Sequence, residues 1–499
     1  MSRFSVSKKG STKTVNHEGA VAYQLDPKME LYSLVCTASL QKKFYEGVDE
    51  TIARLEELIQ LVPQEFVCKL AIYAREKMYL RSIPLVLMIE LLKYNKETDR
   101  GNFVGIRPTI TRIIQRPDEI TEILAYYQIA NDRKGLKKLN ALSNTLKKGV
   151  ANSFNKFNEY QFAKYNRNTE IKLRDAMFLT HPIPKKGNEV LFNKIANNKL
   201  ETPDTWEVAL SKKDGIPKKE KWERLIDEGK LGYMAALRNL RNMVEENVSN
   251  LEKVLALLAD PDNVIKSKQF PFRFLSAWKA VQGLPTFCGS QILNYLEDAI
   301  EASAYNIKGV EDSDNIFVAI DTSGSMTINM SEKSSVTYMD TAMVMGMLLK
   351  SRCNKVLAGI FGEDFMPVTL PSDNILMNVD RLRNLEGKVG HSTNGHLAIE
   401  YLINTKLMAD KVMMFTDCQL WDSGWGYEHL TDYWHKYKKI NPKAELYLFD
   451  MAGYGDTPIS IREPGVYLIA GWSEKIFDVL EAIKNGGNAI SVIEEINIG

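Results

Sequence analysis

The chain of 499 residues has little of what secreted and membrane proteins need. It has five cysteines, an odd number without a Cys-x-x-Cys pair, which argues against a disulfide framework and against a zinc ribbon. We expect free, buried thiols at Cys36, Cys68, Cys288, Cys353 and Cys418. No run of eighteen apolar residues occurs, and the first ten residues lack the apolar core of a signal peptide. The sequence therefore predicts a cytoplasmic protein with no membrane association.

Motifs of common enzymes are also missing. The sequence contains no Gly-x-x-x-x-Gly-Lys phosphate loop, no Gly-x-Ser-x-Gly nucleophile elbow and no His-Glu-x-x-His zinc site. The histidines other than His181 show no metal-ligand spacing: His17, His391, His396, His429 and His435. Catalysis is therefore the weakest of the functional hypotheses, and we expect no enzyme.

Charge is distributed unevenly along a chain whose net charge is only +1. Residues 321–499 hold 16 Lys and Arg against 23 Asp and Glu, which leaves 48 against 40 for residues 1–320. Within the first part, residues 131–200 hold 15 basic and 5 acidic side chains. Such a run is either a solvated surface or a binding surface for a polyanion, and the two interpretations carry about equal weight.

Two patterns of hydrophobicity divide the chain, whose length calls for at least two domains. From about Val48 to Ala304 the spacing is helical, and turns separate segments that recur like the hairpins of a HEAT-like solenoid. The expected helices include 65–80, 84–94, 117–129, 173–180 and 290–302. Residues 1–16 are expected to form a flexible arm.

After Glu311 short apolar runs alternate with helical segments, which predicts a doubly wound α/β domain. The expected strands are 316–320, 356–361, 412–415, 446–449 and 466–470, buried in a parallel sheet. The expected helices are 336–351, 375–385, 396–404, 429–439 and 474–484.

A metal site is predicted at the ends of these strands. The loop Asp321-Thr322-Ser323-Gly324-Ser325 follows the first strand, and Thr393 and Asp417 lie where a von Willebrand A-type site takes its second and third loops. Asp321, Ser323, Ser325, Thr393 and Asp417 offer hard oxygen ligands that suit Mg²⁺. The alternative is a turn that merely caps a helix. A hydroxyl-rich set leaves room for an outside carboxylate, which indicates a docking point for a partner protein.

The chain resembles a known family, the Ro (TROVE domain) RNA-binding proteins, as a bacterial-type member. The resemblance rests on Ala74-Arg75-Glu76-Lys77-Met78-Tyr79-Leu80-Arg81, Phe162-Ala163-Lys164-Tyr165-Asn166-Arg167, Arg174-Asp175-Ala176-Met177-Phe178-Leu179-Thr180-His181, Leu237-Arg238-Asn239-Leu240 and the Asp321 loop. It implies a ring of HEAT-like helical repeats over residues 17–311, closed by a von Willebrand A-type domain with a metal site over residues 312–499.

The resemblance also implies ligands. Such rings bind a small structured non-coding Y RNA on the outside and single-stranded 3′ ends of misfolded RNA in the hole. They act in RNA quality control or the stress response, with an exoribonuclease such as polynucleotide phosphorylase as a possible partner, and we expect a monomer.

The residues matching the family's outer RNA contacts are Lys164 and His181. A third family contact, an Arg one position after Arg167, is Asn168 here, so Arg167 would have to act from the neighbouring position. Lys164 and Arg167 are spaced to share a helix face, which suits contacts to phosphates. Lys147 and Lys148 lie near a similar basic pair in the family.

Two hypotheses from different classes therefore remain beside the weak enzymatic one. The chain is an RNA-binding scaffold, or its A-type domain is a docking module that recruits an ATPase or nuclease through a metal-bridged carboxylate without a specific role for RNA.

Overall fold

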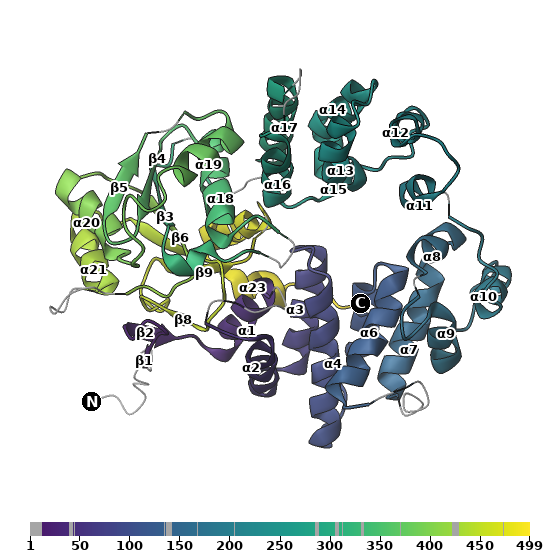
Figure 1. Cartoon of the computed structure of the whole chain (residues 1–499). Helices are drawn as coiled ribbons and strands as arrows, with labels where there is room; N and C mark the ends of the chain where they lie inside the picture. The colour runs from purple at the N-terminus through teal and green to yellow at the C-terminus, as the bar shows by residue number, and fades with distance from the viewer. Residues whose placement is uncertain are drawn as a thin grey trace. The chain divides into compact units, whose positions relative to one another are not determined.

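The structure is a computed structural model, shown in Figure 1, and it describes residues 12–38, 43, 45–133, 135, 142–166, 168–203, 205–284, 289–304, 309–311, 313–330, 334–369, 371–421, 429–472 and 474–499. The chain forms two compact units. The helical unit comprises residues 49–269, 277–302 and 490–499. The A-type unit comprises residues 1–48, 270–276 and 303–489, so it takes in the N-terminal segment that the sequence had assigned elsewhere.

Helices make up the first of these units, and they stack in two layers. Helix α3 packs on α5 and α5 on α7, while α4 packs on α6 and α6 on α8 and α9. Contact between every second helix is what a HEAT-like solenoid of helical hairpins produces, so the predicted architecture is confirmed. The helices from Val48 to Ser303 are α2 (Val48–Leu61), α3 (Gln64–Glu76), α4 (Ser82–Glu97), α5 (Ile106–Ile113), α6 (Pro117–Ala130), α7 (Asn144–Ser153), α8 (Glu159–Tyr165), α9 (Leu173–Thr180), α10 (Glu189–Ala196), α11 (Trp206–Ser211), α12 (Lys218–Asp227), α13 (Tyr233–Glu245), α14 (Leu251–Ala259), α15 (Pro261–Ser267), α16 (Pro271–Val281) and α17 (Gly289–Ser303).

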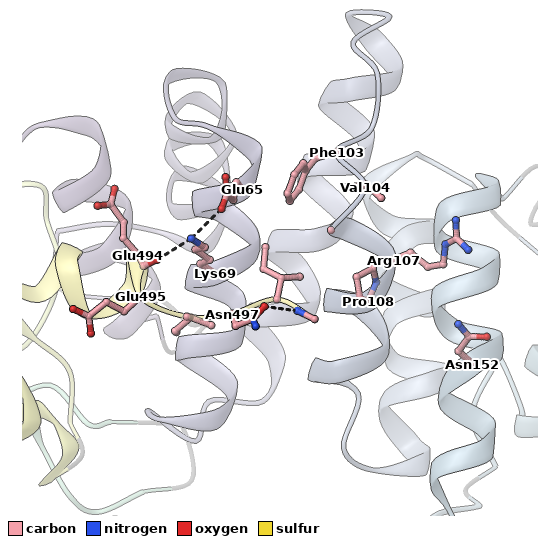
Figure 2. A pocket seen from close by; sticks show the side chains of 14 residues that line it. Glu65, Lys69, Phe103, Val104, Arg107, Pro108, Asn152, Glu494, Glu495 and Asn497 are labelled. Carbon is pink, nitrogen blue, oxygen red and sulfur yellow. Dashed lines mark hydrogen bonds and ion pairs between the residues drawn. The ribbon is translucent and has the colours of Figure 1, made fainter.

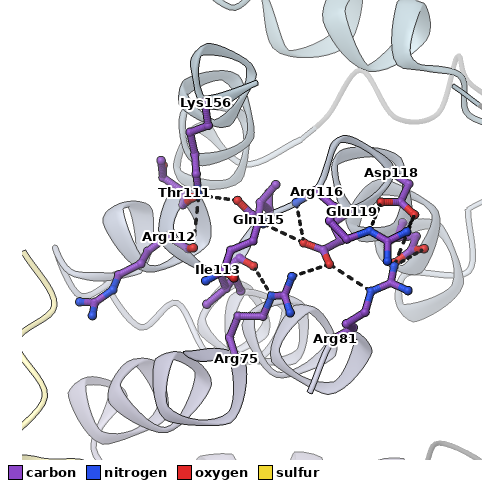
Figure 3. Close-up of polar contacts among 12 residues, drawn as sticks. Arg75, Arg81, Thr111, Arg112, Ile113, Gln115, Arg116, Asp118, Glu119 and Lys156 are labelled. Atoms are coloured by element: carbon purple, nitrogen blue, oxygen red, sulfur yellow. Dashed lines mark hydrogen bonds and ion pairs between the residues drawn. The ribbon is translucent and has the colours of Figure 1, made fainter. Parts of the chain in front are cut away.

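A buried ion network links α3 to α6 (Figure 3). Glu119 is fully buried, and its Oε1 lies 2.7 Å from the guanidinium of Arg75 and 3.2 Å from that of Arg81. Its Oε2 accepts the backbone N–H groups of Gln115 and Arg116. A buried carboxylate with all of these partners is stable, whereas one that lost them would carry an uncompensated charge. Arg75 and Arg81, part of the family motif, therefore hold helices together.

Lys156 is a second basic side chain with a structural role. Its Nζ donates to the backbone carbonyls of Thr111, at 2.7 Å, and of Ile114, at the C-terminal end of α5 (Figure 3). Carbonyls at a helix end lack partners within the helix, and a cation there also meets the negative end of the helix dipole. Burial lowers the pKa of Lys156 to about 8. Not every lysine of the basic stretch is therefore available to a ligand.

The C-terminal residues also belong to the helical unit. After α23 (Ala489–Glu494), the chain runs along α3 and α5, where Lys69 donates to the carbonyl of Glu494 at 2.8 Å and Arg112 to that of Asn497. Residues 494–499 line a pocket of about 640 Å³ together with Lys69, Phe103 and Arg107 (Figure 2). Its lining includes both acidic and basic side chains, such as Glu65 and Lys69.

A six-stranded sheet forms the centre of the A-type unit, in the order β5-β4-β3-β6-β7-β9. Five strands are parallel and occur where the sequence predicted them: β3 (Ile316–Asp321), β4 (Val356–Phe361), β6 (Lys411–Thr416), β7 (Glu445–Asp450) and β9 (Val466–Ala470). Strand β5 (Phe365–Val368) is antiparallel at the edge and was not predicted. It holds Pro367, which lacks an N–H group and is tolerated at a sheet edge.

Helices flank this sheet on both faces, as a doubly wound fold requires (Figure 1). Helix α18 packs against β3, β4 and β6 and pairs with α19, while α20 packs against β4 and β5 and pairs with α21. The helices are α18 (Tyr338–Arg352), α19 (Ile375–Arg383), α20 (His396–Thr405), α21 (Leu430–Ile440) and α22 (Asp478–Lys484), the last preceded by a 3₁₀ turn at Glu474–Phe477.

The N-terminal segment corrects the sequence analysis. Residues 1–16 were expected to form a flexible arm, and residues 1–11 of it lie outside the described residues. In the described part, Lys13–Val15 form strand β1, which pairs with β2 (Val21–Gln24). Strand β2 pairs in turn with β8 (Asp456–Thr457), which follows β7 in the A-type unit. Helix α1 (Pro27–Cys36) packs against β9. Strands of two to four residues carry too weak a pattern to be recognised in a sequence.

Two further expectations concern the cysteine thiols and membrane-spanning helices. Cys36, Cys68, Cys353 and Cys418 are free and buried as predicted, while Cys288 lies outside the described residues. In the part of the chain that the structure describes, no helix is both long and apolar enough to cross a bilayer.

Candidate metal centre and nucleic-acid surface

The five predicted metal ligands meet at the carboxyl edge of the six-stranded sheet. Asp321 is the last residue of β3, Asp417 follows β6, and Thr393 lies in the loop before α20. Ser323 and Ser325 belong to the loop after β3, where a short 3₁₀ turn spans Gly324–Thr327. All five side chains are buried, with at most 5% of the surface of any of them exposed.

Hydrogen bonds fix Asp321 between two strands and a loop. Its Oδ1 accepts the backbone N–H of Ser323 at 2.9 Å, and its Oδ2 accepts the hydroxyl of Thr416, at the end of β6, at 2.6 Å. The first loop is also tied to the second, because the N–H of Gly324 donates to the carbonyl of His391 at 3.2 Å. Asp321 is thereby held in one orientation at the sheet edge.

Asp417 supplies the observation that points to a cation. The chain turns sharply after it, since Cys418 has a φ of +64°, and the N–H of Gln419 donates to Asp417 Oδ1 at 3.0 Å. Its other oxygen, Oδ2, is buried and makes no hydrogen bond. A buried carboxylate oxygen without a partner is costly unless a positive charge neutralises it.

The pKa shifts of the two carboxyl groups also favour a bound cation. Burial raises the pKa of both Asp321 and Asp417 above the ordinary value, and the negative charge of Asp321 raises the pKa of Asp417 further. Two like charges close together in a dry site repel one another. A divalent cation between them removes that cost.

The hydroxyl ligands complete a donor set that suits a small, hard cation. The Oγ atoms of Ser323 and Ser325 lie 3.3 Å apart, and the hydroxyl of Thr393 is oriented by the N–H of Trp421 at 2.6 Å. Among the described residues no group of three or more His, Cys, Asp or Glu gathers to bind a metal, so a transition-metal cluster is not built there. Two carboxylates and three hydroxyls fit Mg²⁺.

A pocket of about 300 Å³ opens beside these ligands. It is lined by Glu18, Tyr45, Ser323, Gly324, Ser325, His391, Ser392, Thr393 and Trp421. Glu18 and Tyr45 come from the N-terminal segment, some 300 residues from the Asp321 loop in sequence. Sequence analysis missed both, because neither belongs to a motif and no local pattern links them to the sheet edge.

The residues predicted to contact RNA lie in the helical unit on consecutive helices. Lys147 and Lys148 are on α7, with Lys148 exposed, and Lys164 is an exposed residue in the last turn of α8. His181 ends α9 in a left-handed conformation, with a φ of +50°, and is exposed. Helix α9 packs on α6 and α7, and α8 packs on α6. The predicted residues therefore lie on neighbouring helices of one unit.

Arg167 was predicted to share a helix face with Lys164. Helix α8 ends at Tyr165, and Asn166 has an extended backbone with a ψ of 94°. Arg167 itself lies outside the described residues.

Further side chains of α9 belong to the same surface, and sequence analysis had not singled them out. Phe178 exposes 54% of its surface, and the guanidinium of Arg174 lies over its ring at 5.5 Å. Lys172 at the start of the helix is exposed as well. The buried face of α9 consists of Leu173, Ala176, Met177 and Thr180. The solvent-exposed face of a surface helix normally carries polar residues. A phenylalanine on that face of α9, Phe178, was therefore the feature of the sequence that could have indicated a binding surface.

Comparison with known proteins identifies the family. The model of the TROVE domain matches residues 14–198 and 196–355, and the model of the Ro60 vWA domain matches residues 315–483. The chain belongs to the TROVE family. TROVE proteins are RNA-binding proteins. The TROVE match covers the helical part and extends into the A-type part as far as residue 355, and the Ro60 vWA match lies within the A-type part.

Individual proteins resemble the chain at low sequence identity. The chain is similar to telomerase protein component 1 of Rattus norvegicus, with 27% identity over 349 residues, and to that of Mus musculus, with 27% identity over 350 residues. The match covers 52% of this chain and only 13% of the length of each of these relatives.

Among solved structures, the crystal structure of the Deinococcus radiodurans Ro (RSR) protein resembles the chain with a TM-score of 0.59 and 16% identity. The alignment covers 91% of this chain and 99% of that one. At this identity the likeness concerns the fold.

Proposed function

We propose that this TROVE protein is a non-catalytic scaffold that binds structured non-coding RNA on the surface of α7, α8 and α9. The observation that supports this most strongly is the set of exposed groups on and beside α9: Lys164, Lys172, Arg174, Phe178 and His181. Cations meet phosphates, and an exposed aromatic ring offers a surface on which an unpaired base stacks. Small Y-like RNA is the proposed ligand of this surface.

Single-stranded 3′ ends of misfolded RNA are the second proposed ligand, in a central hole of a helical ring. The proposal follows from family membership and from the net positive charge of residues 1–320. A protein that binds both kinds of RNA would act in the quality control of non-coding RNA or in its degradation under stress.

The test is binding of a structured RNA by filter retention or fluorescence anisotropy. Lys164→Ala combined with His181→Ala should weaken binding about tenfold, and Lys253→Ala, an exposed lysine on α14 paired with Asp227, serves as the matched control. Unchanged affinity of the double variant would remove these two residues from the interface. Sequencing the RNA that copurifies with the chain would identify the natural ligand.

A docking role for the A-type unit accompanies the RNA role, and the partnerless Asp417 Oδ2 favours it. Mg²⁺ held by Asp321, Ser323, Ser325, Thr393 and Asp417 would accept a carboxylate from a partner protein, for which an exoribonuclease such as polynucleotide phosphorylase, or an ATPase, is the proposed candidate. Because the site holds its cation for binding, no catalytic step is assigned to it. A pull-down with Asp321→Ala should lose protein partners and keep RNA.

A further inference from the structure

A carboxylate of the chain's own N-terminal segment lies at the mouth of the candidate metal centre. Glu18 lines the pocket of about 300 Å³ together with Ser323, Ser325 and Thr393, three of the five ligands. A hydroxyl-rich cation site lacks one acidic ligand, and that is the group which a docking partner is expected to supply. Glu18 therefore stands where the outside carboxylate would bind.

Contacts with the third ligand loop hold the N-terminal segment there. The side-chain amide of Asn16 donates to the carbonyl of Leu420 at 2.8 Å, and the N–H of His17 donates to Oε1 of Gln419 at 2.9 Å. Gln419 and Leu420 lie two and three residues after the ligand Asp417. Asn16 Oδ1 also accepts the N–H of Glu18 at 3.1 Å, which shapes the turn that carries this residue. Glu18 is thus anchored to the loop of Asp417 through the two residues that precede it, Asn16 and His17.

Tyr45 shares the pocket with Glu18 and the ligand loop. Its hydroxyl donates to Glu18 Oε1, and it lines the same pocket of about 300 Å³ as Ser323 and Ser325. The Glu18 side chain and the ligand hydroxyls therefore face one small pocket, in which a change of rotamer would carry the carboxylate toward the cation.

Aromatic packing keeps Tyr45 in place. The ring of His17 stacks on that of Tyr45 with centroids 5.0 Å apart and an angle of 5° between the planes. Tyr454 packs edge-on against both rings, at 5.3 Å from His17 and 5.4 Å from Tyr45. The bond between Tyr45 and Glu18 is therefore part of a packed cluster, which makes the position of Glu18 a built feature of the A-type unit.

We propose that Glu18 is the resident carboxylate of this cation site: it binds the metal ion in place of a partner, and an acidic side chain of a partner must displace it. This inference rests on the proposed cation site. The turn between β1 and β2 then acts as an internal competitor, so that docking is weak until the Glu18 carboxylate leaves. A partner that presents one Asp or Glu would gain the site at the cost of this intramolecular contact.

The experiment is Mn²⁺ binding to the full chain, followed as the loss of the free-ion signal in electron paramagnetic resonance. Glu18→Gln should bind Mn²⁺ at least about tenfold more weakly than the unchanged chain, since it loses a charged ligand and keeps the size of the side chain. Glu463→Gln is the matched control, because Glu463 precedes β9 at the opposite edge of the sheet and is equally able to lose a charge. Its affinity should not change.

Rescue separates a ligand from a structural residue. Glu18→Ala leaves space beside the metal ion, and millimolar acetate should restore part of its Mn²⁺ affinity, while acetate should leave the affinity of the unchanged chain as it is. Equal affinity of Glu18→Gln and the unchanged chain, tighter binding by Glu18→Gln, or no rescue by acetate would each overturn the proposal.

Asp321→Ala distinguishes this failure from failure of the site itself. If Asp321→Ala loses Mn²⁺ while Glu18→Gln does not, the cation site stands and the role of Glu18 is wrong. If Asp321→Ala binds Mn²⁺ as tightly as the unchanged chain, the cation site is wrong, and the role of Glu18 is overturned with it. Thermal unfolding of each variant checks that it folds.

Discussion

The two units of this chain handle charge in opposite ways. The helical unit carries exposed cations such as Lys164 and Arg174 on the surface of its helices, while the A-type unit buries carboxylates, Asp321 and Asp417, at the edge of its sheet. Exposed cations bind phosphates by contacts that salt screens, whereas buried carboxylates bind a cation through a fixed set of oxygens. Under the proposed function, RNA and partner proteins would be recognised by separate physical means, and each activity should be removable without the other.

The largest expected effect is structural and confined to the helical unit. Glu119→Gln leaves the guanidinium groups of Arg75 and Arg81 without their buried carboxylate, and should lower the free energy of unfolding by about 3–5 kcal/mol. Glu122→Gln, on the half-exposed side of the same helix, should cost much less. Urea unfolding followed by circular dichroism measures both. Equal effects would contradict the role of the network.

Asp321→Ala should come next and act on the A-type unit alone. Removing one of two buried carboxylates from the candidate site should weaken Mn²⁺ binding at least about 100-fold, while affinity for structured RNA stays within about twofold. Isothermal titration of metal and anisotropy of labelled RNA give the two numbers. A parallel loss of RNA affinity would break the separation of the two units.

Phe178→Ala tests the aromatic group of the RNA surface. Loss of one stacked base should cost about 1–3 kcal/mol of binding free energy. Phe178→Leu keeps the apolar volume without the flat ring and should recover little of it. Because Phe178 exposes 54% of its surface, neither variant should change the unfolding temperature much. RNA affinity equal to that of the unchanged chain would show that this ring binds no base.

The smallest expected effect is on the pH dependence of folding stability, and it involves neither RNA nor the metal ion. Burial raises the pKa of Glu90 on α4 to about 7, and Glu56 beside it adds to the effect. In the unfolded chain Glu90 titrates near its ordinary value, so the folded state loses stability as pH rises from about 4.5 to 7, and the loss persists above 7. Glu90→Gln should therefore stabilise the protein on the order of 1 kcal/mol at pH 8 and hardly at pH 4. Thermal melts at both values check the sign.

Strong, local patterns were predictable from the sequence. The buried strands β4 and β9 and the helix α9 have the bounds that their apolar residues indicate. The five ligand positions followed from the rule that parallel strands end at one edge of the sheet, and the structure brings these residues together there.

What could not be predicted depends on contacts between distant segments. Glu18 lies at the candidate metal centre because Asn16 and His17 bond to Leu420 and Gln419, and Tyr45 lines the same pocket. Contacts between segments so far apart in the chain leave no periodic signal. The end of α8 at Tyr165 was missed because Asn166, where it stops, is also tolerated inside helices. Arg75 and Arg81 entered the sequence analysis only as part of a motif that carries the family resemblance. Their structural role could not be predicted, because their partner Glu119 lies some forty residues away in the chain.

The central claim is that RNA binds to the helical unit through phosphate contacts at Lys164 and His181 and that the metal centre takes no part. The most direct test is the affinity for one structured RNA, measured from 50 to 300 mM salt, for the unchanged chain, Lys164→Ala and Asp321→Ala. We expect a steep linear fall of log affinity with log salt, a slope reduced by about one in Lys164→Ala, and an unchanged line in Asp321→Ala. A flat salt dependence, or a line displaced by Asp321→Ala instead of Lys164→Ala, would contradict the account.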